Sequence, residues 1–456
     1  MPPARVLVYG MGSSGQAAAR HLLADGLEVV AVDDAEGSAP AAAAASLGIE
    51  LVRRPDPAAL AALAATAAEV VVSPGVPAHH PVFALGAGVA VVGEVELAWR
   101  HARSPIVAVT GTNGKTTVTT LVAAMLNASG VPALAAGNIG VPLLDAVAAA
   151  AEAAPGPGGE APVVVAEVSS FQLALTDTFR PAVGAWCNFS PDHLDWHGSV
   201  SAYRAAKAKL WANAGPGTVA VANAEDDVVL AEAARAGARG ATLTSFGLHD
   251  GDYRLVGDRL STPAGDEITS LAALGRSLPH DVANALCASA TALASGATRA
   301  GCASALGSFT GLPHRVELVG EANGVRFYDD SKATTPGATL AALSGFDSAV
   351  LIAGGRNKGL ELGVLRQAAA RLRGVVAIGD AAGEVRQSFE GACPVVEAGS
   401  MHEAVVAAAD LAHRGDAVVL SPACASFDWY RSYAERGDDF AREVRALAGA
   451  GPEAGP

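Results

Sequence analysis

The sequence predicts an α/β protein of three domains, each built on a parallel sheet covered by helices. Short runs of β-branched residues alternate with alanine-rich stretches along the chain, which is typical of strand–helix–strand units. With 456 residues, the chain has room for about three domains of roughly 150 residues. Three of the runs are followed by glycine-bearing or charged turns, at residues 10–15, 111–117 and 354–359, so we expect one ligand-facing loop for each sheet.

Several apolar runs have the length and composition of buried strands. These are Val6–Tyr9, Val29–Val32, Val70–Val72, Ile106–Thr110, Val163–Ala166, Ala349–Ala353, Val375–Ile378 and Ala417–Leu420. The pattern between them places the domains at residues 1–96, 97–312 and 313–456. We expect the first domain to be Rossmann-like, the central one to be a P-loop mononucleotide-binding domain, and the third to be Rossmann-like again.

The composition argues against some classes of partner and location. Lys and Arg number 31 against 46 Asp and Glu, a net charge of −15, so nucleic acid or an anionic membrane would repel the protein as a whole. No uninterrupted apolar run reaches the roughly 18 to 20 residues that span a bilayer. The five cysteines form no CxxC pair, which argues against a disulfide framework. We therefore expect a cytoplasmic protein, monomeric, with small-molecule partners.

The first glycine loop, GMGSSG at residues 10–15, lies between a predicted strand and a predicted helix. Asp33 follows Gly15 by 18 positions, at the end of the next strand, as in a dinucleotide-binding fingerprint. A tight turn without a ligand would have the same pattern. A nicotinamide-dependent dehydrogenase is the competing functional interpretation at this point, and the rest of the chain has to decide.

The second glycine loop, TGTNGKTT at residues 110–117, indicates a phosphate site. Its backbone N–H groups and the following helix would hold phosphates, Lys115 would neutralise their charge, and the Thr116 hydroxyl would bind Mg²⁺. ATP is the expected ligand. The predicted contacts in this loop are Gly111, Thr112, Asn113, Gly114, Lys115, Thr116 and Thr117.

Acidic and imidazole side chains follow two neighbouring predicted strands. Glu167 ends the strand Val163–Ala166, and Asp192 and His193 follow the strand Val183–Asn188. Ligands of open α/β sheets bind at the carboxyl ends of the strands, so these groups are placed to hold a magnesium ion that bridges phosphates. A nicotinamide-dependent dehydrogenase would leave the second nucleotide loop and the metal-binding acids unexplained. These motifs therefore weaken the dehydrogenase interpretation of the first glycine loop.

Together these motifs resemble the Mur ligases, and the resemblance covers essentially the whole chain. They are GTNGKTT at 111–117, GNIG at 137–140, EVSSFQL at 167–173, NFSPDHLD at 188–195, DSKAT at 330–334 and SPACAS at 421–426. Within this family the combination is most similar to the ligases that add D-glutamate to UDP-N-acetylmuramoyl-L-alanine. A sister Mur ligase, a folylpolyglutamate synthase and a catalytically dead nucleotide-binding regulator are the alternatives.

The resemblance implies further ligands for ATP and for two Mg²⁺ ions. Asn284, Arg315 and Asp330 would contact ATP, although Asp281 stands where the family pattern HNxxN has its first Asn. Thr116, Glu167, His193 and Lys207 would hold the metal ions, with Lys207 carbamylated by CO₂. Lys209 lies nearby in the segment YRAAKAK, but the spacing favours Lys207. Lys115, His193 and Lys207 would be the catalytic residues.

The resemblance also implies the two substrate sites. The UDP substrate would be bound by Ser13, Ser14, Asp33, Ser73 and Asn138. D-Glutamate would be bound by Lys332, Thr334, Lys358, Ser426 and Tyr433. The chain departs from the family at Asp34 and Ala35, since the family often has a basic residue near this position. The implied reaction passes through an acyl phosphate and yields ADP and phosphate.

Overall fold

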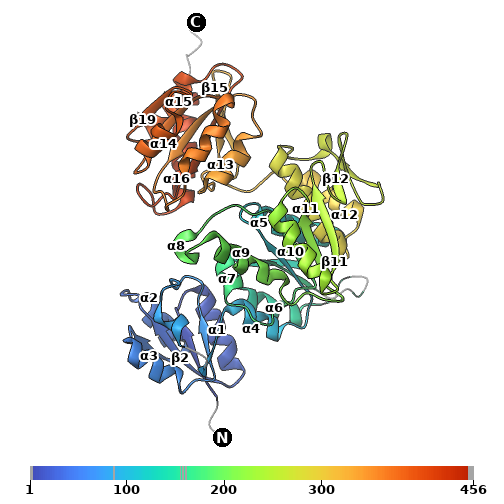
Figure 1. Ribbon diagram of the computed structural model, residues 1–456, viewed down its shortest axis with the longest axis vertical. Coiled ribbons are helices and arrows are strands. Elements are labelled where there is room, and N and C mark those ends of the chain that lie inside the picture. The colour runs from blue at the N-terminus through green and yellow to red at the C-terminus, as the bar shows by residue number, and fades with distance from the viewer. Residues whose placement is uncertain (1–3, 86–87, 155, 157–158, 160–161, 450–456) are drawn as a thin grey trace. The chain divides into compact units, whose positions relative to one another are not determined.

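The structure is a computed structural model that describes residues 4–449 apart from 86–87, 155, 157–158 and 160–161. It contains three sheets with helices packed on them, which confirms the predicted α/β class (Figure 1). By internal contacts the chain divides into two compact units. The first comprises residues 1–189, 196–274 and 283–309, and the second comprises 190–195, 275–282 and 310–456.

The first sheet has five parallel strands in the order β3-β2-β1-β4-β5. Their bounds are β1 Arg5–Tyr9, β2 Glu28–Asp33, β3 Glu50–Arg53, β4 Glu69–Val72 and β5 Ala90–Val92. The accompanying helices are α1 Ser13–Ala24, α2 Ala39–Leu47, α3 Pro57–Ala64 and the 3₁₀ turn Pro81–Ala84. Valine dominates the strands because both sheet faces are buried, as in parallel sheets generally. The order reverses at β1, so the loops after β1 and β4 meet at the carboxyl edge.

The second sheet has nine strands in the order β14-β13-β12-β11-β10-β9-β6-β8-β7. Its strands are β6 Ile106–Thr110, β7 Ala133–Gly137, β8 Val163–Glu167, β9 Val183–Trp186, β10 Val219–Asn223, β11 Thr242–Gly247, β12 Tyr253–Val256, β13 Arg259–Ser261 and β14 Glu267–Ser270. The strands from β7 to β12 pair in parallel, whereas β13 and β14 continue the sheet in antiparallel fashion.

Helices surround this second sheet (Figure 1). They are α5 Lys115–Ala128, α6 Leu143–Glu152, α7 Ser170–Ala174, α8 Leu194–His197, α9 Val200–Ala208, α10 Asp227–Ala238, α11 Pro279–Ala294 and α12 Arg299–Ser308, with 3₁₀ turns at Lys209–Trp211 and Leu271–Ala273. Among the described residues, no helix combines the length and apolar character needed to cross a membrane. The five cysteines are all free thiols.

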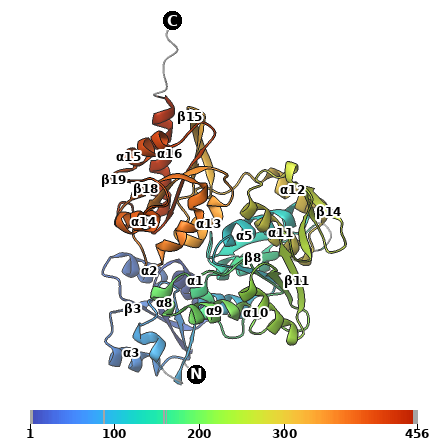
Figure 2. The ribbon, with the colours of Figure 1, turned by 45° about the horizontal axis from the view of Figure 1, so that its top comes forward.

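The third sheet has six strands in the order β15-β16-β20-β17-β18-β19. Its elements are β15 Glu317–Ala322, β16 Val325–Asp329, α13 Pro336–Leu343, β17 Ala349–Gly354, the 3₁₀ segment Leu362–Arg371, β18 Leu372–Ile378, α14 Ala382–Phe389, β19 Val395–Ala398, α15 Met401–Leu411, β20 Ala417–Ala423 and α16 Tyr433–Gly449. Side chains alternate between two cores: Leu351 faces the core of α13 and α14, while Val350 and Ile352 face that of α15 and α16. Figure 2 shows these four helices around the third sheet.

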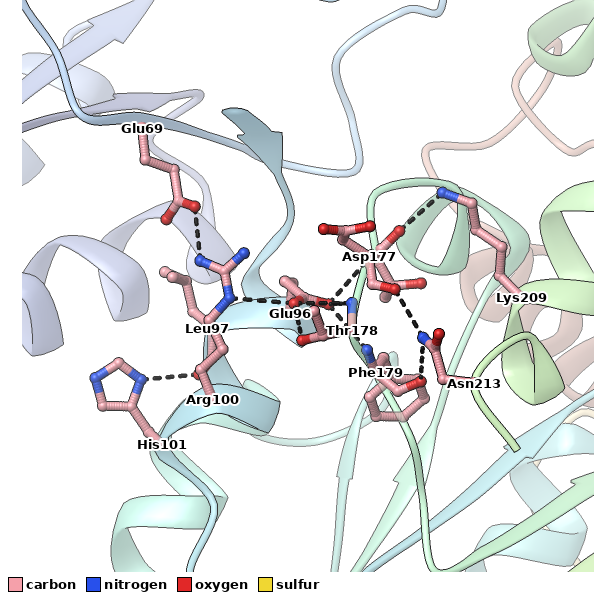
Figure 3. A network of polar contacts seen from close by, with 11 residues as sticks. Glu69, Glu96, Leu97, Arg100, His101, Asp177, Thr178, Phe179, Lys209 and Asn213 are labelled. Carbon is pink, nitrogen blue, oxygen red and sulfur yellow. Dashed lines mark hydrogen bonds and ion pairs between the residues drawn. The ribbon is translucent and has the colours of Figure 1, made fainter. Parts of the chain in front are cut away.

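Helix α4, Glu94–His101, joins the first two sheets within the first unit. The Glu96 carboxylate is fully buried and accepts hydrogen bonds from the backbone N–H groups of residues 177–179 and from the Thr178 hydroxyl (Figure 3). Arg100 bridges Glu96 and Glu69 at 3.1 and 2.6 Å. At the start of the helix, Glu94 Oε1 accepts from the Leu144 N–H at 2.6 Å, at the first turn of α6. The predicted boundary after residue 96 therefore falls inside α4.

Candidate active site

The phosphate loop connects β6 to α5 and is held from both sides. The N–H groups of Thr112 and Asn113 donate to the backbone and side-chain oxygens of Asn188, at 3.0 and 2.9 Å. Gly114 has φ of +80°, a conformation that side chains other than glycine rarely adopt. A Cβ at this position would also collide with the Asn284 amide. The loop geometry thus depends on glycine and places Asn284, a predicted ATP contact, directly against the loop.

Two lysine ammonium groups converge on one carbonyl of this loop. Lys115 Nζ donates to Gly111 O at 2.9 Å and to Thr112 O at 2.8 Å, and Lys207 Nζ donates to Gly111 O at 2.6 Å. Lys207 is only 1% exposed and lies 4.9 Å from the centre of the Tyr203 ring. Two ammonium groups therefore lie together at the phosphate loop, where their charge would favour a bound phosphate.

The strands β9, β6, β8 and β7 are consecutive parallel neighbours at one end of the second sheet, so their carboxyl ends meet at one edge. Glu167 ends β8 there and is 2% exposed. Its Oε1 accepts from Asn138 Nδ2 at 2.8 Å, and Asn138 follows β7. Within the described part of the chain, Glu167 Oε2 is buried without a hydrogen-bond partner. A buried carboxylate oxygen lacking a donor fits a cation ligand, because burying it unpaired would otherwise be costly.

Lys207 and Lys209, two residues apart, have different environments. Lys209 Nζ donates to Ala174 O at 2.7 Å and Thr176 O at 2.8 Å, at the end of α7. Burial lowers its pKa, while Asp177 and Glu96 act in the opposite direction. Of the two lysines, Lys207 is therefore the one that contacts the phosphate loop.

Asp192 and His193 belong to the second unit and are described within it. The His193 N–H donates to Asp192 Oδ1 at 2.7 Å, and φ of His193 is +51°. Asp192 Oδ2 lies 3.3 Å from His193 Nε2, and Asp192 Oδ1 lies 3.9 Å from Lys358 Nζ. The histidine predicted as a metal ligand is thus oriented by a carboxylate that is 6% exposed.

A cavity of about 350 Å³ opens at the carboxyl edge of the first sheet. The predicted residues Ser13, Ser14, Asp33 and Ser73 all line it. Asn138, predicted to contact the same substrate, is not among its lining residues and lies instead beside Glu167. The cavity also has Tyr9 and Asp34 in its wall.

Gly10 and Gly15 are required where the glycine loop touches the loop after β4. Gly10 has φ of +89°, and its carbonyl accepts from the Ser73 hydroxyl at 2.7 Å. A Cβ on Gly15 would collide with the Gly10 carbonyl. The glycine spacing therefore serves close packing of β1, α1 and the Ser73 loop, which forms the wall of the cavity.

The predicted D-glutamate residues lie on loops after adjacent parallel strands of the third sheet. Lys332 and Thr334 follow β16, Ser426 follows β20, and Lys358 follows β17. Tyr433 is the first residue of α16, and Lys332 Nζ lies 3.7 Å from the centre of its ring. These loops share one edge of the sheet, as a single ligand site at this edge would require.

Two buried charged side chains support these loops. Asp330, a predicted ATP contact, accepts from the Ser421 hydroxyl at 2.7 Å, and burial raises its pKa to about 7, against the effects of Ser421 and Arg315. Arg436, which the sequence motifs did not single out, is 1% exposed and donates to the Ser331 hydroxyl and to the carbonyls of Ser331 and Cys424. It thereby ties the DSKAT and SPACAS motifs together.

Asp281, where the chain departs from the family pattern, is engaged by neighbouring side chains. Both of its oxygens lie 3.2 Å from Arg276 Nε, and Oδ1 lies 3.4 Å from His280 Nε2. Its carboxylate is thus paired within the second unit, whereas Asn284 lies at the phosphate loop.

Three family models together match most of the chain. Residues 4–93 match the MurD-like N-terminal domain, residues 109–292 the Mur ligase middle domain, and residues 314–424 the Mur ligase glutamate ligase domain. The chain belongs to the Mur ligase family. Among its relatives are UDP-N-acetylmuramoylalanine--D-glutamate ligases of Frankia casuarinae, 44% identical over 97% of this chain and 94% of that protein, and of Thermobifida fusca, 42% identical over 98% and 99%.

Solved structures agree with this assignment at the level of the fold. MurC of Thermotoga maritima is similar with a TM-score of 0.57 and 21% identity, covering 97% of this chain and 99% of that one. MurF of the same organism, in complex with ADP, is similar with a TM-score of 0.58 and 16% identity, covering 98% and 96%.

Proposed function

We propose that this protein is an ATP-dependent ligase that joins D-glutamate to UDP-N-acetylmuramoyl-L-alanine in peptidoglycan precursor synthesis. The observation that carries the proposal is the full-length similarity to ligases named for this reaction, the first of them 44% identical over 97% of the chain. The phosphate loop, the buried acid at the sheet edge and the cavity of the first sheet supply the three kinds of contact that such a ligase needs.

ATP would bind across the loop between β6 and α5. The N–H groups of the loop, the start of α5 and Lys115 together favour the β- and γ-phosphates. Asn284 lies against Gly114, which supports a role near the nucleotide. In the second unit, Arg315 and Asp330 remain the proposed contacts to phosphate and ribose.

The donor set fits magnesium. Glu167 Oε2, buried without a hydrogen-bond partner in the part of the chain that the structure describes, is the observation that supports it. Thr116, Glu167, His193 and carbamylated Lys207 would hold two Mg²⁺ ions, which neutralise phosphate charge when bound. Carbamylation would replace the Lys207 ammonium, 2.6 Å from Gly111 O, by an anion and so remove one of the two clustered cations.

The reaction has two steps in this proposal. A carboxylate oxygen of the alanyl group attacks the γ-phosphorus of ATP, the bond to the β,γ-bridging oxygen breaks, and ADP leaves as an acyl phosphate forms. The D-glutamate amine then attacks the acyl carbon, the C–O bond to phosphate breaks, and the amide forms with loss of a proton. Lys115 neutralises charge in the first step, and His193, oriented by Asp192, positions the acyl phosphate.

D-Glutamate would bind at the edge of the third sheet. Its two carboxylates need cations and hydroxyl donors, which Lys332, Thr334, Lys358, Ser426 and Tyr433 supply. Arg436 holds the loops that carry Lys332 and Ser426. We expect the protein to work as a monomer in the cytoplasm, where its nucleotide substrates occur.

Phosphate release tests the proposal. We expect release from ATP with UDP-N-acetylmuramoyl-L-alanine to depend on D-glutamate, and the amide product to appear by mass spectrometry in equal amount. Release that does not need D-glutamate, or that L-lysine or meso-diaminopimelate supports instead, would overturn the assignment of D-glutamate as the substrate.

A further inference from the structure

The loop of residues 354–360, which carries the predicted D-glutamate ligand Lys358, is closed by the amide of Asn357. Asn357 Oδ1 accepts from the Leu360 N–H at 2.9 Å, and Asn357 Nδ2 donates to the Leu360 carbonyl, also at 2.9 Å. Lys358 and Gly359 lie between the two bonded residues, and Gly359 has φ of +79°. The two ends of one amide thus fix the backbone on which Lys358 stands.

The same amide also contacts helix α14. Asn357 Nδ2 donates to Glu384 Oε2 at 2.7 Å. Glu384 belongs to the first turn of α14, where the helix dipole favours a carboxylate. Because β18, which leads into α14, pairs directly with β17, this contact anchors the Lys358 loop to the adjacent loop. The Lys358 side chain itself is 25% exposed, so its ammonium is accessible to a ligand.

The loop after β18 supports a further D-glutamate loop as well. Asp428 stands two residues after the predicted ligand Ser426, and Asp428 Oδ2 accepts from the Asp380 N–H at 3.0 Å. Gly379 has φ of +68°, and a Cβ at Gly379 would collide with the same Asp428 oxygen. Residues 379–384 contain no predicted ligand, yet they contact the loops after β17 and β20, which do.

We propose that Asn357 is a positioning residue for the incoming amino acid: anchored by Glu384, it holds Lys358 where the ammonium pairs with one carboxylate of D-glutamate. The inference rests on the proposed function, in which Lys358 binds this substrate. Amide formation joins the amine of D-glutamate to the acyl carbon, so a contact to its carboxylates contributes equally to the ground state and the transition state. Loss of the Asn357 contacts should therefore raise the KM for D-glutamate and leave kcat nearly unchanged.

Steady-state kinetics of the full-length protein test the proposal, with D-glutamate varied at saturating ATP and UDP-N-acetylmuramoyl-L-alanine. In Asn357→Ala we expect the KM for D-glutamate to rise about 10-fold, as for a weakened hydrogen bond to a charged group, while kcat and the KM for ATP change by less than about threefold. Glu384→Ala removes only the anchor and should raise the KM by a smaller factor. Glu384→Gln keeps an oxygen that accepts from Asn357 Nδ2, so its KM should stay within about twofold of the wild type.

Asn127 provides a matched control, because its amide makes the same kind of contacts in the first unit. Asn127 Oδ1 accepts from the Ala133 N–H at 3.0 Å, and Nδ2 donates to the carbonyls of Ala123 and Ala133, both at 2.9 Å. Asn127→Ala therefore removes a comparable set of hydrogen bonds at the end of α5. It should lower the Tm about as much as Asn357→Ala does, with the KM for D-glutamate within about twofold of the wild type.

The outcomes separate positioning by Asn357 from the ligase assignment. If Asn357→Ala leaves the KM for D-glutamate unchanged, lowers only kcat, or is matched by Asn127→Ala, the positioning role is wrong while the ligase assignment stands. Glu384 is exposed, so its two variants should fold and give an independent decision: equal KM values in Glu384→Ala and Glu384→Gln would overturn the anchor. If the wild-type protein shows no D-glutamate-dependent phosphate release, the proposed function fails as well.

Discussion

Removing the Glu96 carboxylate should strongly destabilise the first unit. The oxygens of this fully buried side chain accept from Asp177 N at 2.8 Å, from Thr178 N at 3.1 Å and from Phe179 N at 3.2 Å, besides the Thr178 hydroxyl. In Glu96→Ala these donors and Arg100 lose their common acceptor. The loss of one member of a buried charged network typically costs about 3–5 kcal/mol of unfolding free energy.

Urea denaturation followed by tryptophan fluorescence measures this loss. Trp99, on the same helix, packs edge-on against Phe179 with ring centres 6.1 Å apart, so its emission reports on this junction. Glu69→Ala is the control, because it removes only the outer partner of Arg100 and should cost no more than about 1 kcal/mol. A Glu96→Ala protein that unfolds within 1 kcal/mol of the wild type would refute this account of the junction.

The same carboxylate gives the prediction a pH dependence. Burial alone would raise the pKa of Glu96, but the hydrogen bonds from Thr178 and Asp177 and the charge of Arg100 outweigh it, so its pKa is lowered from the ordinary 4.5. A lowered folded-state pKa contributes stability that is present above pH 4.5 and is lost as the pH falls through the folded-state value. The difference in unfolding free energy between wild type and Glu96→Ala should therefore shrink as the pH falls below 4.5 and toward the folded-state pKa of Glu96.

Two further predictions concern Lys207 and Lys209. Lys209, at the end of helix α9, which carries Lys207, donates to the carbonyls of Ala174 and Thr176 at the end of α7. Lys209→Met removes this link, so we expect kcat to fall about 10- to 100-fold, with partial recovery in Lys209→Arg. Asn213→Ala, which removes donors from the same 177–179 loop, is the matched control and should change kcat by less than threefold; equal losses in both variants would show a general effect on folding. Lys207→Ala should abolish most activity, and acetate or formate should restore part of it if the missing group is an anion. An unchanged rate in Lys207→Ala would exclude a carbamate there.

The fold could be predicted because its determinants are local. Valine-rich runs in the sequence mark β1, β2 and β8. Gly114 marks the phosphate loop, and its φ of +80° in the structure explains why a glycine stands there. The α/β class and the family are confirmed, whereas the roles of the individual site residues stay predictions.

The contacts that support the site left no signal in the sequence. Glu96 accepts from backbone N–H donors that lie 81 to 83 residues further along the chain, and Tyr9 meets His80 across 71 residues. Arg436 belongs to none of the sequence motifs, although it is buried beneath two of them. No periodicity or spacing rule relates such positions, because strand order and loop packing alone bring them together. Near the cavity, the glycine loop, Asp33 and the departure at Asp34 are visible in the sequence, whereas the contact between Tyr9 and His80 is not.

The junction at α4 has a consequence for ligand binding. Because the sheet with the cavity and the sheet with the phosphate loop belong to one compact unit, a ligand that binds only in the cavity adds its binding free energy to the stability of both. At a concentration of a hundred times Kd this contribution is about 2.7 kcal/mol. If the nucleotide-linked substrate binds in the cavity, as proposed, it would therefore also stabilise the sheet that carries the phosphate loop against unfolding of the unit.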